Sequence, residues 1–173
     1  MRRLTYLSLA AAAALLAAAA PGTAATSSSA SGLDKEYIKT SIEGDRFEIA
    51  GGKLALSKSH NAAVRALGAR LVKDHSASLS DTLKLAKRFG VEAPKKPSES
   101  QQWELSIVGG QSGTAFDHWY SDLETLDHIQ DLQDASDEIK DGSNPAVRDD
   151  AKTEVPTLRT HLKMSRAALK ASG

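Results

Sequence analysis

Apolar residues recur every three to four positions along most of this chain, the spacing that places them on one side of an α-helix. This period is clear in four segments, residues 33–58, 62–89, 114–140 and 145–171. Lysines and arginines lie on the opposite side of the second and fourth segments. The pattern predicts a single all-α domain whose core includes Val64, Leu71, Leu79, Leu132, Ile139 and Leu158.

Capping residues mark the predicted helix ends. Asn61 and Asn144 precede helices, Pro145 suits a first helical position, and Gly90 suits the position just after a helix. The first and second segments are joined by a short turn, as are the third and fourth. Residues 91–113 form a long link, with an irregular, proline-containing part over 92–102 and a short helical turn over 103–108. This order predicts an antiparallel four-helix bundle, two helical hairpins joined by a long crossover.

The first residues have the composition of a secretory signal. Arg2 and Arg3 precede an apolar, mostly alanine run over residues 9–20, and small residues follow it. The run is too short for a typical membrane-spanning helix, which disfavours a retained anchor. We therefore expect a signal peptide over 1–25, a flexible lead-in over 26–32, and a helical domain over 33–173. The expected location is the periplasm or the outside of the cell, without a transmembrane segment after cleavage.

Composition removes several classes of function. The chain contains no cysteine, so disulfides, thiolate metal sites and cysteine nucleophiles are excluded. Loss of Arg2 and Arg3 with the leader changes the formal net charge from 0 to about −2. No basic stripe is present, and nucleic acid is not an expected partner.

Four ionisable residues share the inward faces of the predicted helices at similar depth: Glu48, His75, His128 and His161. A buried carboxylate or imidazole is costly without a partner, so these side chains are expected to share one interior site. They offer the oxygen and nitrogen ligands that zinc, copper and iron accept, and Glu124 and Glu154 are possible additional ligands. The competing interpretation is a hydrogen-bonded Glu/His network that binds nothing, which is the commoner outcome for buried polar groups. Asp74 is expected to be a solvated neighbour of His75.

A second apolar stripe runs along the third segment and consists of Phe116, Trp119, Leu123 and Leu126. Either the long link covers this stripe, which is the commoner outcome, or a protein partner or second copy of the chain binds it.

Several short motifs in a fixed order resemble one known family. They are Phe47-Glu48-Ile49, Leu54-Ala55, Asn61-Ala62-Ala63-Val64-Arg65, Asp74-His75, Phe116-Asp117 with Tyr120 and His128, Val155-Pro156 and His161-Leu162. Over residues 34–170 the chain resembles the exported, ferritin-like family named domain of unknown function 4142. The resemblance implies a ferritin-like four-helix bundle outside the cytoplasm and no established activity.

Ferritin-like di-iron enzymes use Glu-x-x-His motifs, and this chain contains none. Glu124 is followed three residues later by Asp127, and Glu154 by Thr157. No Gly-x-Ser-x-Gly or phosphate-binding loop is present either, so we expect no enzyme. The favoured hypothesis is an exported, cofactor-free helical module with an envelope or stress-related binding role. The alternative is a metal-binding, redox-type protein with a single zinc, copper or iron ion.

Overall fold

The computed structural model describes residues 29–173, and this part of the chain contains five helices and no strand. The helices are α1 (Gly32–Lys58), α2 (Ala62–Phe89), α3 (Glu99–Gly109), α4 (Gly113–Asp141) and α5 (Pro145–Ser172). The prediction of an all-α fold is confirmed. The expected signal peptide lies outside the described residues, and α1 begins at Gly32, inside the expected flexible lead-in.

The predicted helix ends agree with the capping geometry. Asn61 caps α2 by accepting hydrogen bonds from Ala63 N and Val64 N, and Asn144 caps α5 just before Pro145. Gly90 ends α2 in the left-handed region at φ 66°, a conformation that glycine adopts without strain.

The long link contains more helix than the sequence pattern predicted. α3 begins at Glu99, within the stretch expected to be irregular, because Ser98 and Gln101 form a capping box there. Pro97 precedes this cap, so the prolines end before the helix begins.

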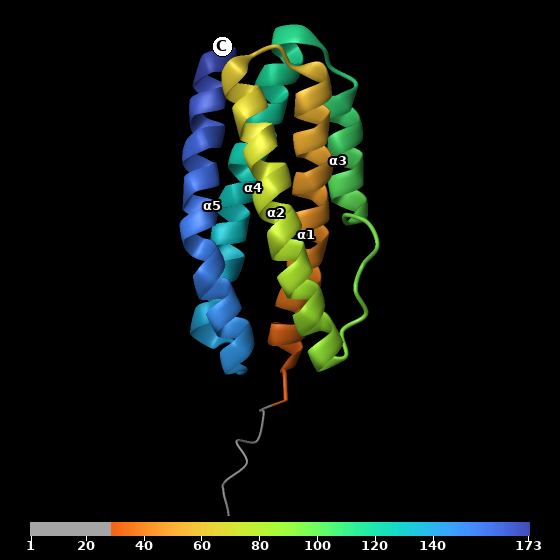
Figure 1. The fold of residues 1–173 in the computed structure, drawn as a ribbon, viewed down its shortest axis with the longest axis vertical. Helices are drawn as coiled ribbons and strands as arrows, with labels where there is room; N and C mark the ends of the chain where they lie inside the picture. The colour runs from red at the N-terminus through yellow and green to blue at the C-terminus, as the bar shows by residue number, and fades with distance from the viewer. Residues whose placement is uncertain (1–28) are drawn as a thin grey trace, which may run out of the picture.

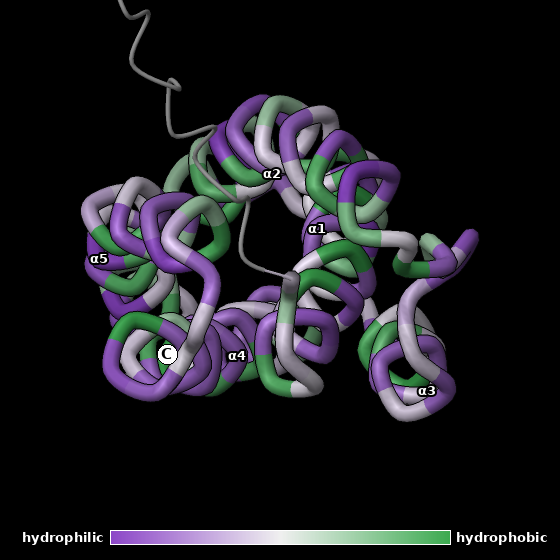
Figure 2. The backbone as a smooth tube through the Cα atoms, turned by 90° about the horizontal axis from the view of Figure 1, so that it is seen from below, coloured by the Kyte–Doolittle hydropathy of each residue, from purple (hydrophilic) through white to green (hydrophobic). Residues whose placement is uncertain are grey.

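The four long helices lie side by side, and α3 lies outside them, next to α1 and α4 (Figure 1, Figure 2). α1 packs along α2, and α4 along α5; these pairs meet through contacts of α2 with α5 and of α1 with α4. α1 and α2 approach closely at two glycines. A Cβ atom added to Gly52 would lie 2.6 Å from the carbonyl oxygen of Gly68, so a side chain there would separate the helices.

Two apolar clusters fill the interior and leave a polar layer between them. One cluster includes Ile38, Ile42 and Leu158, and the other includes Leu67, Leu71 and Tyr120. On each of the four long helices, Glu48 or one of the three candidate histidines lies between the residues that belong to the first cluster and those that belong to the second. Of the six predicted core residues, Val64, Leu71 and Leu158 are buried. The prediction is wrong for the others, because Leu79, Leu132 and Ile139 are only partly buried at the margin of the first cluster.

The start of α1 is tied to the turn between α4 and α5. The carboxylate of Asp34 accepts hydrogen bonds from Ser143 N at 2.9 Å, Asn144 N at 3.0 Å and Ser143 Oγ at 2.7 Å. These contacts limit how far the α1–α2 pair can slide along the helix axes relative to the α4–α5 pair. They therefore help to determine which residues of different helices lie opposite one another. Within residues 29–173, no helix has the length and apolar character needed to span a membrane.

Candidate metal centre

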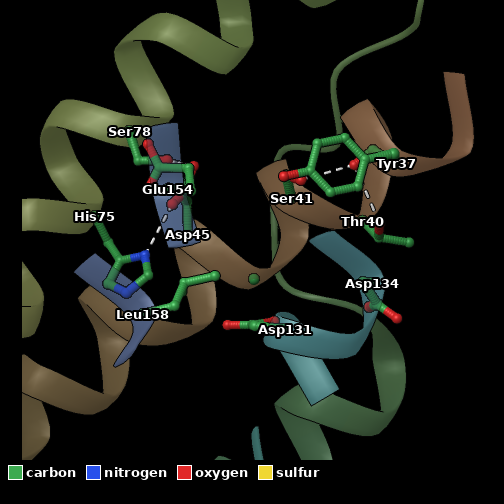
Figure 3. A pocket seen from close by; sticks show the side chains of 11 residues that line it. Tyr37, Thr40, Ser41, Asp45, His75, Ser78, Asp131, Asp134, Glu154 and Leu158 are labelled. Carbon is green, nitrogen blue, oxygen red and sulfur yellow. Dashed lines mark hydrogen bonds and ion pairs between the residues drawn. The ribbon is translucent and has the colours of Figure 1, made fainter. Parts of the chain in front are cut away.

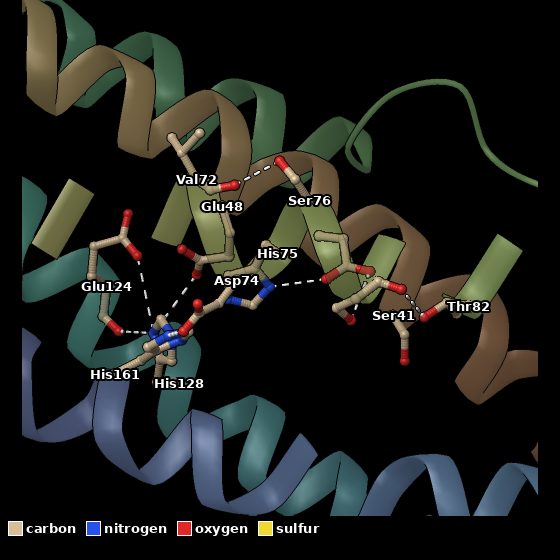
Figure 4. Close-up of polar contacts among 12 residues, drawn as sticks. Ser41, Glu48, Val72, Asp74, His75, Ser76, Thr82, Glu124, His128 and His161 are labelled. Carbon is tan, nitrogen blue, oxygen red and sulfur yellow. Dashed lines mark hydrogen bonds and ion pairs between the residues drawn. The ribbon is translucent and has the colours of Figure 1, made fainter. Parts of the chain in front are cut away.

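Three histidine rings from three different helices meet in the polar layer (Figure 4). Their centroids are 5.1 Å apart for His75 and His161, 5.2 Å for His128 and His161, and 6.0 Å for His75 and His128. One ring nitrogen from each histidine lies within 4.8 Å of the other two. All three side chains are buried. The structure thus brings together the three histidines predicted from the sequence.

The ring of His128 is held by its own helix. Its Nδ1 lies 2.7 Å from the carbonyl oxygen of Glu124, one turn earlier in α4. A carbonyl oxygen can only accept, so Nδ1 carries the proton. The other nitrogen, Nε2, therefore has a free lone pair.

The ring of His161 is held by a carboxylate from another helix. Its Nε2 lies 3.0 Å from Oδ2 of Asp74 on α2. Burial acts to raise the pKa of Asp74, but hydrogen bonds from Arg70 and His161 outweigh it, and the pKa lies below its ordinary value. An ionised Asp74 can only accept, which places the proton on Nε2 and leaves Nδ1 free. The expectation that Asp74 is a solvated neighbour was wrong, because the flank of α2 that carries it faces α5.

The ring of His75 contacts a third acidic residue. Its Nδ1 lies 2.9 Å from Oδ1 of Asp45 on α1, and Ser78 Oγ donates to the other carboxylate oxygen at 3.1 Å. Burial raises the pKa of Asp45 to about 8. Near neutral pH, Asp45 is therefore mostly protonated and donates to Nδ1, so the proton of the neutral ring is on Nε2. When Asp45 ionises, the ring proton moves to Nδ1 and Nε2 gains a free lone pair.

The three remaining ring nitrogens are buried and make no hydrogen bond within the described part of the chain: Nε2 of His75, Nε2 of His128 and Nδ1 of His161. Burial lowers the pKa of His75 and His161 to about 4 and that of His128 to about 3. The rings are therefore neutral at pH 7. A lone pair is available on Nε2 of His128 and Nδ1 of His161, and on Nε2 of His75 once Asp45 ionises, which a bound cation favours. Metal-binding histidines commonly have this arrangement, with one nitrogen free and the other held by a carboxylate or carbonyl.

Carboxyl groups gather beside His128. Glu48 Oε1 is 3.7 Å and Glu124 Oε2 is 4.0 Å from His128 Nδ1. Burial, together with repulsion from Glu124 and Asp127, raises the pKa of Glu48 well above its ordinary value. Burial raises the pKa of Glu124 to about 8. Glu48 thus lies next to His128, but its closest contact with that ring is at the protonated nitrogen rather than at the free one.

A cavity of about 50 Å³ lies beside His75 and is lined by residues of α1, α2, α4 and α5 (Figure 3). Its walls carry four carboxyl groups, those of Asp45, Asp131, Asp134 and Glu154. Burial, followed by repulsion from Asp45, raises the pKa of Glu154 to about 7. Glu154 was predicted as a possible metal ligand, and the structure places it in this cavity beside Asp45.

Four acidic residues near the site were not predicted as part of it: Asp45, Asp74, Asp127 and Asp131. For Asp45 and Asp131 a signal was present, since each lies three residues from a predicted site residue, Glu48 or His128, and hence on nearly the same helix face. Asp74 and Asp127 lie directly beside a site histidine and about 100° around the helix from it. Their contacts depend on which neighbouring helix packs against that side of their own helix. The hydrophobic pattern of one helix contains no information on this packing.

The apolar stripe of α4 is divided between interior and surface. Phe116 is fully buried and stacks on Tyr120 at 5.7 Å between ring centroids, so its predicted role in a partner surface is wrong. Trp119 and Leu126 are exposed, at 54% and 60%, and line a shallow pocket together with Trp103 and Ile107 of α3. The long link therefore covers the stripe only in part.

Comparison with known proteins supports the fold and identifies the family. The chain is similar to the crystal structure of a DUF305 fragment from Deinococcus radiodurans, with a TM-score of 0.71 and 13% sequence identity. The match covers 83% of this chain and 99% of that chain, and at this identity it shows similarity of fold alone. No curated protein matches the chain. The family model described as Domain of unknown function (DUF4142) matches residues 18–168, and the chain belongs to this family.

Proposed function

We propose that this protein is an exported, ferritin-like four-helix bundle that binds one divalent transition-metal ion through His75, His128 and His161. The observation that carries the proposal is the meeting of three buried histidine rings, which bring one nitrogen each within 4.8 Å of the others and which each have one nitrogen without a hydrogen-bond partner among the described residues.

The alternative to a metal ion is a polar network that satisfies itself. Such a network would pair the inner nitrogens with one another or with the nearby carboxyl groups, because unpaired buried polar atoms are destabilising. The hydrogen bonds of the three rings instead run outward, to Asp45, Asp74 and the Glu124 carbonyl. This pattern favours metal binding over the network that was preferred from sequence alone.

The ligand set limits the choice of metal. Three neutral imidazoles suit zinc, copper(II) and iron(II), whereas calcium and magnesium prefer oxygen ligands. Tetrahedral zinc with nitrogen ligands at about 2.0–2.1 Å requires nitrogens roughly 3.3 Å apart, so the rings must draw together modestly on binding. Three protein ligands leave one coordination position for water or another small ligand.

The remaining parts of the proposal have separate support. The order short turn, long link, short turn between four long helices is that of two hairpins joined by a crossover, as in ferritin-like bundles. Export is supported by the arginines, apolar run and small residues of positions 1–25.

Metal titration of the purified mature protein tests this function. We expect one equivalent of Zn²⁺ or Cu²⁺ to bind and to raise the melting temperature by roughly 5–10 °C at a free concentration of about 100 times Kd. His75→Leu should remove both effects, while the metal-free variant stays folded because an apolar side chain needs no partner. His118→Ala is the matched control, since His118 is exposed on α4. Absence of stoichiometric binding, or equal loss in both variants, would overturn the proposal.

A further inference from the structure

Two carboxyl groups, those of Glu48 and Glu124, lie beside Nδ1 of His128, and a third, that of Asp127, lies near Glu48. Glu48 comes from α1, whereas Glu124 and Asp127 come from α4, and Glu48 and Glu124 are 0% exposed. Glu48 lies close enough to Glu124 and Asp127 that both acidic groups raise its pKa. Figure 4 shows Glu48 and Glu124 extending toward His128 from different helices.

These carboxyl groups lack the partners that normally stabilise buried charge. Both oxygens of Glu48, both of Glu124 and Oδ2 of Asp127 are buried and accept no conventional hydrogen bond from residues 29–173. Within the same part of the chain, the only basic side chain within 4.0 Å of Glu48 or Glu124 is His128. His128 is neutral, so only protons shared among the carboxyl groups or a bound cation can balance their charge.

His128 presents a different ring nitrogen to each of the two groups of side chains, although Asp127 is also close enough to His75 for their charges to interact. Glu48 and Glu124 approach its Nδ1, which already donates its proton to the Glu124 carbonyl. His128 therefore has no lone pair on this side, and its free Nε2 belongs to the other cluster. Asp131, one turn after Asp127, also offers a carboxylate oxygen within 4.8 Å of Glu48 and His128. The available ligands on this side are oxygens.

We propose that Glu48, Glu124, Asp127 and Asp131 form a second cation subsite, built only from oxygen ligands, that binds a hard divalent cation of the Mn²⁺ class. Carboxylate ligands suit Mn²⁺, Mg²⁺ and Ca²⁺, whereas the imidazole site suits softer ions, so the two subsites differ in selectivity. The subsite does not require the three-histidine centre to be loaded, and it can exist if the proposed function fails.

The packing around the subsite keeps the carboxyl groups together. A Cβ atom added to Gly51 would lie 3.0 Å from Glu124 Oε1, so the backbone of α1 passes directly beside this carboxyl group. The aromatic ring of Tyr120 lies 3.5 Å from the same Cβ position and limits movement on that side. Glu124 is thus confined near Glu48.

Titration with Mn²⁺, followed by electron paramagnetic resonance of the free ion, tests the proposal. We expect one equivalent of Mn²⁺ to bind the wild-type protein, both with and without saturating Zn²⁺. The double change Glu48→Gln with Glu124→Gln should weaken Mn²⁺ binding at least about tenfold. Loss of an outer-shell partner of a metal ligand lowers metal affinity by about 10- to 100-fold, and removal of the charge of two ligands should lower it at least as much. Zn²⁺ binding to this variant should stay within about threefold of the wild type.

Controls separate this subsite from the three-histidine centre. Asp127→Asn removes one ligand and provides the readout if the double variant does not fold, and exposed Asp137→Asn should leave Mn²⁺ binding unchanged. No Mn²⁺ binding, or unchanged binding in both variants of the cluster, would overturn the subsite. Loss of Mn²⁺ in His75→Leu, or loss of Zn²⁺ in the double variant, would show one mixed centre and would also overturn it. Zn²⁺ binding without Mn²⁺ binding would refute this inference alone.

Discussion

The Nε2 atom of His161 lies 3.0 Å from Oδ2 of Asp74, and this contact joins α5 to α2 beside the candidate metal centre. Arg70, one turn earlier in α2, pairs with the same carboxylate oxygen. The contact leaves Nδ1 of His161 as the ring nitrogen that has no hydrogen-bond partner among residues 29–173. Because Asp74 directly precedes His75, α2 supplies one candidate ligand and the group that orients another.

Replacement of Asp74 by asparagine should weaken Zn²⁺ binding by about 10- to 100-fold while the fold is retained. The amide no longer offers a negative charge to His161, so the ring loses its fixed orientation and part of its basicity. Isothermal titration measures the change. Asp81→Asn is the control, since Asp81 is an exposed residue of α2 whose ion pair, among the residues that the structure describes, is with Lys84. Equal affinities for wild type and Asp74→Asn would show that this carboxylate does not support a metal ligand.

Much of the fold follows from local sequence signals. The capping residues Asn61, Gly90 and Asn144 predict three helix ends, and each agrees with the structure. The start of α3 was missed because the prolines were given more weight than the capping pair Ser98 and Gln101. A proline disfavours helix at its own position and just before it, but leaves the following residues free to form one.

Two glycine substitutions in α1 should have opposite effects on stability. Gly52→Ala should lower the free energy of unfolding by about 1–3 kcal/mol, because its Cβ would meet Gly68 O at 2.6 Å and Val72 Cγ2 at 2.8 Å. Gly44→Ala should raise it by up to about 1 kcal/mol, since the nearest atom to its Cβ is 4.0 Å away and alanine favours helix. Urea denaturation measures both changes. A stabilising Gly52→Ala would contradict the close contact of α1 with α2.

The stability of the metal-free protein should fall as the pH rises from about 6.5 to about 8. The pKa values of Asp45 and Glu124 are about 8 and that of Glu154 is about 7, against ordinary values of 3.8 for Asp and 4.5 for Glu. The folded chain therefore holds protons that the unfolded chain has released, and it loses this stabilisation as the carboxyl groups ionise. The lowered pKa values of the three histidines act in the opposite direction only below about 6.5.

Each proton held in this way contributes up to about 1.4 kcal/mol per pH unit. Urea denaturation at both ends of the pH range measures the loss. Saturating metal should reduce it, because a bound cation stabilises the ionised carboxylates. A rise in stability of the metal-free protein over this range would contradict the assignment of buried, protonated carboxyl groups.

The acidic cavity beside His75 should speed the arrival of cations. Asp134 and Glu154 are half-buried in its wall, and negative groups along such a passage raise the local cation concentration. Asp134→Asn combined with Glu154→Gln should lower the Zn²⁺ association rate about tenfold at low salt. Affinity should change less than this rate. Stopped-flow measurements with exposed Asp149→Asn as control test the effect, and an unchanged rate would place the route to the site elsewhere.

The histidines of the site could be predicted because each lies within the inward stripe of its own helix. The contacts of His75 with Asp45 and of His161 with Asp74 could not be predicted, because they depend on the axial positions of α1, α2 and α5 relative to one another. The contacts of Asp34 with the turn before α5 contribute to this alignment, and they join residues 109 and 110 positions apart. A periodic pattern carries no information on contacts of this kind.

X-ray absorption spectroscopy of the Zn²⁺-loaded protein tests the three-histidine centre most directly. We predict three nitrogen ligands at about 2.0–2.1 Å with the multiple-scattering signature of imidazole, and one fewer imidazole in His161→Leu if it retains the ion. A shell made only of oxygen atoms, or one with an unchanged number of imidazoles in that variant, would contradict the account.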